Sequence, residues 1–161
     1  MLRFPNPGST LANFIEIFKN INEKLLDYTF DLDDMVIVTA ERGMASSSGF
    51  IGKEAIDKST RKDRSRDPLY NQLKMYSELY RHLGWIKSSS NKALNFNITP
   101  FGELVAKSKD PIHEFILSIL CISFPNESIE SKSKAVVRPF FTILKIINKI
   151  QKFITRDEII I

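Results

Sequence analysis

Six polar side chains lie on one predicted helix and carry the chemistry needed to read DNA base pairs. The helix is expected over Pro68–Leu83, because its apolar residues recur at spacings of four and three and build one buried stripe. Asn and Gln can pair with adenine, Arg and Lys with guanine, and Glu can accept from cytosine. The alternative is the ordinary solvated face of an amphipathic helix. The residues on this predicted outer face are Asn71, Gln72, Lys74, Ser77, Glu78 and Arg81.

A basic run comes just before that helix, with a single acid, Asp63, inside it. Cations placed in this way can contact phosphates, which gives affinity but little sequence information. A solvated basic loop accounts for the same run equally well. The net charge of +4 is only a small excess of cations. The expectation of phosphate contacts therefore depends on the clustering of cations in this run and not on the net charge. The cations of the run are Lys58, Arg61, Lys62, Arg64 and Arg66.

A hairpin is expected directly after the helix. Gly84 should end the helix in the left-handed conformation, and Trp85-Ile86 begins a strand. Apolar and polar residues alternate over Leu94–Ile98, which predicts a half-buried second strand, and Thr99-Pro100 caps and opens a new helix. This order is the last part of a winged helix-turn-helix. The residues of the wing turn that we expect at sugar and phosphate are Ser89, Asn91 and Lys92.

Two helices are expected nearer the N-terminus. Ser9 or Thr10 can cap the first, whose apolar positions run from Leu11 to Leu25. The second covers Asp31–Arg42, although its β-branched run Val36–Thr39 leaves a strand as a competing interpretation. The remaining segments expected before the basic run are a turn over Met44–Gly49 and a short helix over Phe50–Ser59.

A second unit is expected from residue 109 onward. Asp110-Pro111 and Arg138-Pro139 each open a helix, and Thr155–Glu158 matches a capping box before an apolar run. Because the chain stops as that helix begins, we expect a piece of a longer protein. The fold class is therefore mainly α, a tandem winged helix-turn-helix with a small β-hairpin wing, with domains over 1–108 and 109–161. The inner residues expected in the two helices are Ile112, Phe115, Ile116 and Ile119, then Phe140, Phe141, Leu144, Ile147 and Ile150.

Composition and motifs argue against catalysis within this chain. Of the 161 residues, 43% are hydrophobic and 26% charged, as in an ordinary globular protein. Cys121 is the only cysteine and lies in an apolar run, so we expect a buried thiol, no intrachain disulfide and a cytoplasmic protein without membrane contact. The Glu130-Ser131-Lys132 spacing falls in a polar turn, and neither His82 nor His113 has ligands at metal spacing. No catalytic or metal-binding residue is expected.

The order of these motifs resembles the DNA-recognition region of type IIS restriction endonucleases, the group of AlwI-like and PleI-like enzymes. The resemblance covers roughly the last two-thirds of the chain. It implies a pair of winged-helix subdomains that read an asymmetric site on double-stranded DNA. It also implies a Mg²⁺-dependent cleavage domain that is C-terminal or separate, so this chain would bind DNA without a cofactor and would not cut it. The matching motifs are Ser65-Arg66-Asp67, Leu83-Gly84-Trp85-Ile86, Thr99-Pro100-Phe101-Gly102, Asp110-Pro111, Arg138-Pro139 and Ile154-Thr155-Arg156-Asp157-Glu158.

Two other functions fit the same pattern. A winged-helix transcriptional regulator would be expected to dimerise on a palindromic site. A winged-helix scaffold for protein–protein interaction would expose an apolar patch and show no salt-sensitive affinity for DNA.

Overall fold

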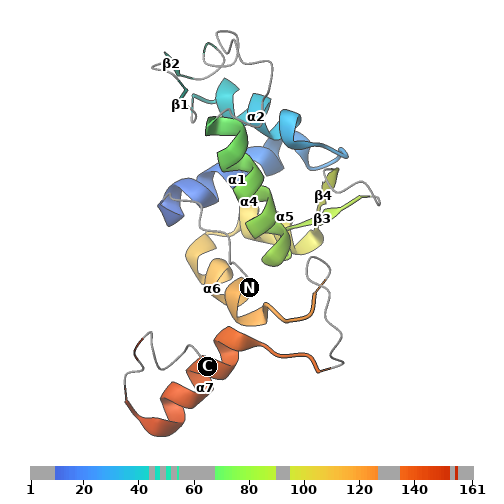
Figure 1. Ribbon diagram of the computed structural model, residues 1–161. Helices are drawn as coiled ribbons and strands as arrows, with labels where there is room; N and C mark the ends of the chain where they lie inside the picture. The colour runs from blue at the N-terminus through green and yellow to red at the C-terminus, as the bar shows by residue number, and fades with distance from the viewer. Residues whose placement is uncertain are drawn as a thin grey trace. The chain divides into compact units, whose positions relative to one another are not determined.

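The computed structural model describes residues 10–43, 46–47, 50–51, 54, 68–89, 95–126, 135–152 and 155. The chain divides into two compact units, Met1–Pro111 and Ile112–Ile161. It is mainly helical, as the sequence predicts, and it contains two small antiparallel hairpins among the described residues, of which the sequence predicts the second (Figure 1). The elements in chain order are α1 (Leu11–Leu25), α2 (Leu32–Glu41), β1 (Ser46–Ser47), β2 (Phe50–Ile51), α4 (Pro68–His82), β3 (Ile86–Ser88), β4 (Phe96–Ile98), α5 (Pro100–Lys107), α6 (Pro111–Cys121) and α7 (Pro139–Ile150).

Side-chain caps fix the starts of the first two helices. The Thr10 hydroxyl accepts a hydrogen bond from the Asn13 N–H at 3.3 Å and begins α1. Asp31 and Asp34 form a capping box at α2, in which each carboxylate accepts from the other residue's N–H at 3.0 Å. The β-branched run of α2 is therefore helical, and the competing strand is wrong.

Helix α4 ends in the way that its glycine predicts. Gly84 has a φ of +74°. The Trp85 N–H donates to the Tyr80 carbonyl at 2.9 Å, and the Gly84 N–H donates to the Arg81 carbonyl at 3.0 Å. These two bonds form a Schellman motif, which needs a left-handed residue that glycine adopts without strain. The chain then turns directly into the hairpin.

The predicted hairpin β3–β4 is present, and the backbone of a third segment pairs with it. Ile86 lies opposite Ile98, and Ser88 lies opposite Phe96. Phe96 also exchanges two backbone hydrogen bonds, at 3.0 and 2.7 Å, with Phe30 in the link between α1 and α2. Phe30, Phe96, Ile86 and Ile98 are all buried, so one face of this small sheet lies in the core.

Thr99 and Gly102 join the hairpin to α5. The Thr99 hydroxyl donates to the Gly84 carbonyl at 2.6 Å and accepts from the Gly102 N–H at 2.9 Å. The Thr99 N–H donates to the Trp85 carbonyl at 3.0 Å. A Cβ at position 102 would lie only 2.1 Å from the Trp85 carbonyl oxygen. The start of α5 can approach the end of α4 this closely only because residue 102 is glycine.

An aromatic cluster fixes the inner side of α4 on α1. Ring centroids lie 4.5 Å apart for Phe14 and Tyr80, 4.7 Å for Phe18 and Trp85, and 5.6 Å for the stacked pair Tyr80 and Trp85. The Tyr80 hydroxyl donates to the Phe14 carbonyl at 2.8 Å. Burial, followed by the nearby Tyr76, raises the pKa of Tyr80 well above its usual value. These contacts fix the inner side of α4.

Two expectations for the segment after α2 are wrong. Ser46–Ser47 and Phe50–Ile51 form an antiparallel hairpin, where we expected a turn and the start of a helix. In the sequence Ser48-Gly49 separates the strands, a dipeptide suited to a tight hairpin connection. Glu54 is helical, and the rest of that expected helix lies outside the described residues.

The second unit exposes residues that were expected inside. Ile112 and Ile116 of α6 are 53% and 50% exposed, and Cys121 is exposed rather than buried. These helices are apolar around most of their circumference, so spacing alone does not identify the buried side. A pair of hydrogen bonds at 2.8 Å between Phe124 and Val137 joins the segments that follow α6 and precede α7. None of the described helices is long and apolar enough to cross a membrane.

Candidate nucleic-acid interface

The outer side of α4 carries four residues at helical spacing. Asn71, Lys74, Met75 and Glu78 are three or four positions apart and therefore share one face. Lys74 and Glu78 are exposed, Met75 is 38% exposed and Asn71 is half-buried. Met75 was not among the expected contacts, although its position four residues after Asn71 places it on this face. The face thus offers an amide, a cation, a thioether and a carboxylate.

Two of the expected contact residues point elsewhere. Placing Ser77 on the outer face is wrong, because it is 4% exposed and its hydroxyl donates to the Lys74 carbonyl at 2.8 Å. Gln72 is half-buried, and its amide donates to the Tyr76 hydroxyl at 3.0 Å. Helix α4 packs against α2 as well as α1, so its buried arc is wider than its apolar stripe.

The last turn of α4 offers one cation. Arg81 is half-buried, and its Nε is enclosed without a hydrogen-bond partner. Burial lowers the pKa of His82, against an opposing effect of the Glu78 carboxylate. His82 is therefore neutral near pH 7 and adds no charge. The rest of the Arg81 guanidinium, at the edge of the outer face, can meet an anion.

The described part of the hairpin adds an exposed lysine. Ser89 is exposed, and its N–H donates to the Asn95 carbonyl at 2.8 Å, which extends the pairing beyond β3. Lys87 is exposed and lies opposite Asn97, whose amide donates to the Thr29 hydroxyl at 3.0 Å. The sequence analysis missed Lys87, although its alternation with the buried Ile86 places it on the outer face of the strand.

Seven of the predicted phosphate and sugar contacts lie outside the described residues, so their role stays a prediction. They are Lys58, Arg61, Lys62, Arg64, Arg66, Asn91 and Lys92.

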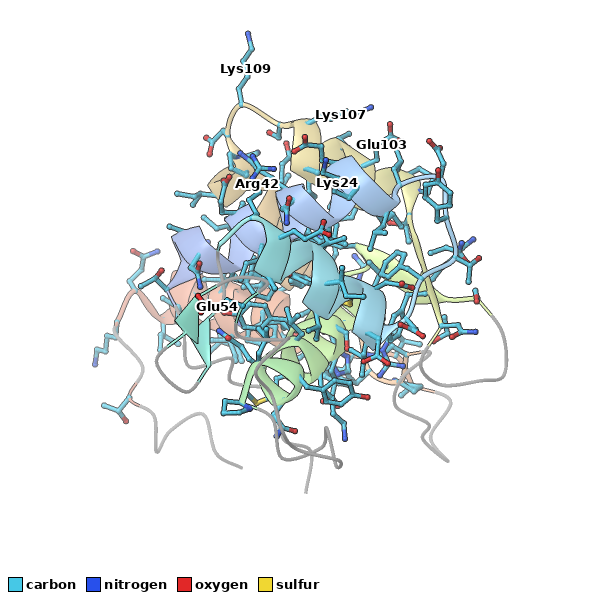
Figure 2. The ribbon with its side chains drawn as sticks, turned by 90° about the horizontal axis from the view of Figure 1, so that it is seen from above. Lys24, Arg42, Glu54, Glu103, Lys107 and Lys109 are labelled. Carbon is cyan, nitrogen blue, oxygen red and sulfur yellow. The ribbon has the colours of Figure 1, made fainter. Side chains whose placement is uncertain are left out.

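A polar cleft of about 700 Å³ on the first unit is a weaker candidate. In Figure 2, Lys24, Arg42 and Lys107 of its lining appear on one side of the fold. Arg42 is already held by Asn20 at 3.0 Å and by Glu23, and its hydrogen bond and charge lower the pKa of Glu23. Three carboxylates lie among the four cations of the lining, so the cleft lacks the one-signed field that attracts a phosphate. Its charged lining residues are Glu16, Lys19, Glu23, Lys24, Asp27, Arg42 and Lys107.

Neither a metal site in the described residues nor a similar known protein indicates the function. Over the described ranges, no three His, Cys, Asp or Glu side chains are grouped so that they could hold a metal ion. No protein-family model, curated protein or solved structure matches this chain. The function is therefore argued from the geometry of α4 and its hairpin.

Proposed function

We propose that the first unit is a winged-helix module that binds double-stranded DNA in a sequence-specific manner, as the recognition part of a type IIS-like restriction endonuclease. The observation that carries the proposal is the two-sided character of α4. Its inner side is fixed by Tyr80 and the aromatic cluster, while Asn71, Lys74 and Glu78 lie on the outer side. A rigid helix with polar residues on its outer face is what major-groove recognition requires.

The order of the elements supports this proposal. Phe30 lies between α1 and α2 and pairs with β4, which in turn pairs with β3. Apart from the β1–β2 hairpin between α2 and α4, the order is helix, extended residue, helix, helix and hairpin, as in a winged helix, and the extended residue lies beside the second strand of the last hairpin. Residues 42–67 make the connection from α2 to α4 longer than the usual 3–4-residue turn. The basic run lies in this longer connection, where it would add phosphate contacts.

The dimensions of α4 suit the groove. Its 15 residues make a helix about 22 Å long, and the diameter of an α-helix with its side chains, about 10–12 Å, matches the width of the major groove, about 12 Å. Asn71 would pair with adenine, Glu78 would accept from cytosine, and Met75 would contact the methyl group of thymine. Lys74, Lys87 and Arg81 would contact guanine or phosphate. Each assignment rests on spacing along one helix face or strand; Lys74, Met75, Glu78 and Lys87 are exposed, and Asn71 and Arg81 are half-buried.

The test is fluorescence anisotropy on random-sequence duplexes at low and physiological salt, followed by sequencing of the bound fraction. Mg²⁺ is present, and the DNA is recovered on a gel. We expect salt-dependent binding that enriches one short asymmetric sequence and leaves the DNA intact. Asn71→Ala should cost about 1–3 kcal/mol on the enriched sequence only. The matched control Lys24→Ala removes an exposed cation from α1. Absence of binding at both salt concentrations, or an equal loss for Asn71→Ala on every sequence, would contradict the proposal.

One observation favours a second candidate function, the binding of a protein partner. Ile112, Ile116 and Leu117 of α6 are 40–53% exposed. Single exposed apolar residues are usual on a protein surface, whereas a group of them indicates an interaction site. An exposed apolar patch is what the interaction-scaffold alternative predicts. The two functions are compatible, because the polar face lies on the first unit and the apolar residues lie on the second.

A further inference from the structure

Helix α7 buries none of its 12 residues. By contrast, α1 and α4 of the first unit bury seven and six residues. Isolated helices shorter than about 12–15 residues are marginal in water, and most helices in proteins are stabilised by packing of an apolar face. The residues Phe141, Leu144, Ile146 and Ile150 of α7 are nevertheless 42–50% exposed. Helix α7 therefore offers an apolar surface that the described residues do not bury.

Most of the apolar residues of α7 form one uninterrupted arc. At about 100° per residue the arc covers roughly 160° of the helix circumference, from Ile146 to Leu144, and no polar residue of the helix lies within it. The residues in the middle of the arc are half-buried, and those toward both edges are exposed. Its large apolar residues are Phe140, Ile143, Leu144, Ile146, Ile147 and Ile150.

The cations of α7 lie on the side opposite this arc. By the same spacing Lys145, Lys149 and the N-cap residue Arg138 fall within roughly 40° of one another, and the middle of this group lies roughly 160° from the middle of the apolar arc. All three are exposed, and Lys152 follows just after the helix. Residues 135–152 contain no Asp or Glu. The helix therefore has one apolar side and one cationic side.

This two-sided pattern favours a membrane surface over a protein partner. A protein on the apolar side would leave the cations far from the contact, where they would contribute little. An interfacial helix instead buries its apolar side about 5–10 Å deep at the boundary of headgroups and acyl chains. Because a helix with its side chains is about 10–12 Å across, its opposite side then lies among the headgroups or just above them. Cations at that level are within a Debye length, about 8 Å at physiological salt, of anionic phosphates.

We propose that α7 binds the surface of a bilayer that contains anionic lipids, with its apolar arc in the bilayer and Lys145 and Lys149 near the phosphates. Burial of the arc and attraction of the cations would act together. Phe141 lies between the two sides, and the Lys145 ammonium is 4.7 Å from the centre of its ring. The sequence predicts no membrane contact and places Leu144 and Ile150 inside, whereas the structure exposes both. This site goes beyond DNA binding and does not depend on it, because its residues belong to the second unit.

Co-sedimentation of the full chain with two kinds of vesicle tests the proposal. One kind is phosphatidylcholine alone, and the other is phosphatidylcholine with an equal amount of phosphatidylglycerol. Each Lys or Arg near an anionic surface raises the affinity about fivefold, so we expect at least about tenfold tighter binding to the anionic vesicles, with an advantage that shrinks as salt rises. Lys145→Gln with Lys149→Gln should weaken that binding at least about tenfold. The matched control, Lys24→Gln with Lys109→Gln, removes two exposed cations from the first unit and should change it by less than about twofold.

A second variant tests the apolar side. Leu144 and Ile150 are 50% and 46% exposed, so Leu144→Ser with Ile150→Ser should keep the fold, which far-UV circular dichroism checks, and should abolish binding to the anionic vesicles. Equal affinity for the two kinds of vesicle, or an unchanged affinity in either α7 double variant, would overturn the proposal. Failure to bind either kind of vesicle would also overturn it, and concentration-dependent sedimentation of the chain alone would then identify a second copy as the occupant. These results are independent of DNA binding, because no DNA is present in the assay.

Discussion

Gly102→Ala should destabilise the first unit, because the junction of α4, the hairpin and α5 leaves no room for a methyl group. The added Cβ would lie 2.1 Å from the Trp85 carbonyl oxygen and 2.8 Å from its carbonyl carbon. Both are backbone atoms, so no side-chain rotation can relieve the overlap. The start of α5 must instead move away by on the order of 1 Å, in a region packed as closely as a crystal.

The expected loss of stability is about 2–3 kcal/mol. Overpacking of a core costs about 1–3 kcal/mol, and a clash between backbone segments lies near the upper end. The movement also stretches the hydrogen bonds of Thr99 to Gly84 and Trp85. The better helix propensity of alanine offsets less than about 1 kcal/mol of this loss of stability. In a domain of this size such a loss lowers the melting temperature by roughly 10–20 °C.

Trp85 gives a direct measurement of this effect. It is the only tryptophan, and it is fully buried beside the substituted position. Its fluorescence therefore reports urea and thermal unfolding of this unit. The matched control is Glu103→Ala in the same helix, which removes an exposed ion pair with Lys107 and should cost at most about 0.5 kcal/mol. A Gly102→Ala protein within about 0.5 kcal/mol of wild type would refute the close packing of α5 against Trp85.

Other substitutions test single features of the first unit. Asp34→Ala removes one half of the capping box with Asp31 and should cost about 0.5–1 kcal/mol in urea unfolding, whereas no loss would mean that the cap is not formed. Lys74→Ala with Lys87→Ala should reduce the slope of log affinity against log salt by about two, and an unchanged slope would exclude both from phosphate contact. The lowered pKa of His82 predicts that wild type loses stability as pH falls from about 6.5 through the lower folded-state pKa, because the unfolded chain takes up the proton first. His82→Gln should lack this part of the pH dependence in urea unfolding at matched pH values, and identical curves would contradict it.

The features that the sequence predicts well are those with local causes. Thr10, Asp31 and Thr99 accept hydrogen bonds from N–H groups within three residues, so their role as caps depends only on nearby chain. Gly84 likewise ends α4 through bonds to the preceding turn. Polar–apolar alternation placed Phe96 and Ile98 on the buried face of the hairpin. Each of these predictions needs only the propensities of adjacent residues.

The features that the sequence missed depend on distant packing. Ser77 is buried because α4 packs against two helices, and a single apolar stripe does not report the second contact. The pairing of Phe30 with Phe96 joins residues far apart in the chain, and no local pattern indicates it. In α6 and α7 the apolar residues extend over more than one side of the helix, so periodicity cannot distinguish the exposed Ile116 and Leu144 from half-buried neighbours.

The charge distribution also determines which experiment can assign the DNA interface. Lys145 and Lys149 on α7 are exposed cations, as is Lys74 on α4. Any of them can release counterions from DNA, so a salt-dependent affinity alone identifies a basic protein and not a recognition helix. Asn71 carries no charge, so its replacement leaves counterion release unchanged, and a loss confined to the cognate sequence would indicate a contact with a base edge. The difference between cognate and random DNA in Asn71→Ala is therefore the quantity that ties binding to the outer face of α4.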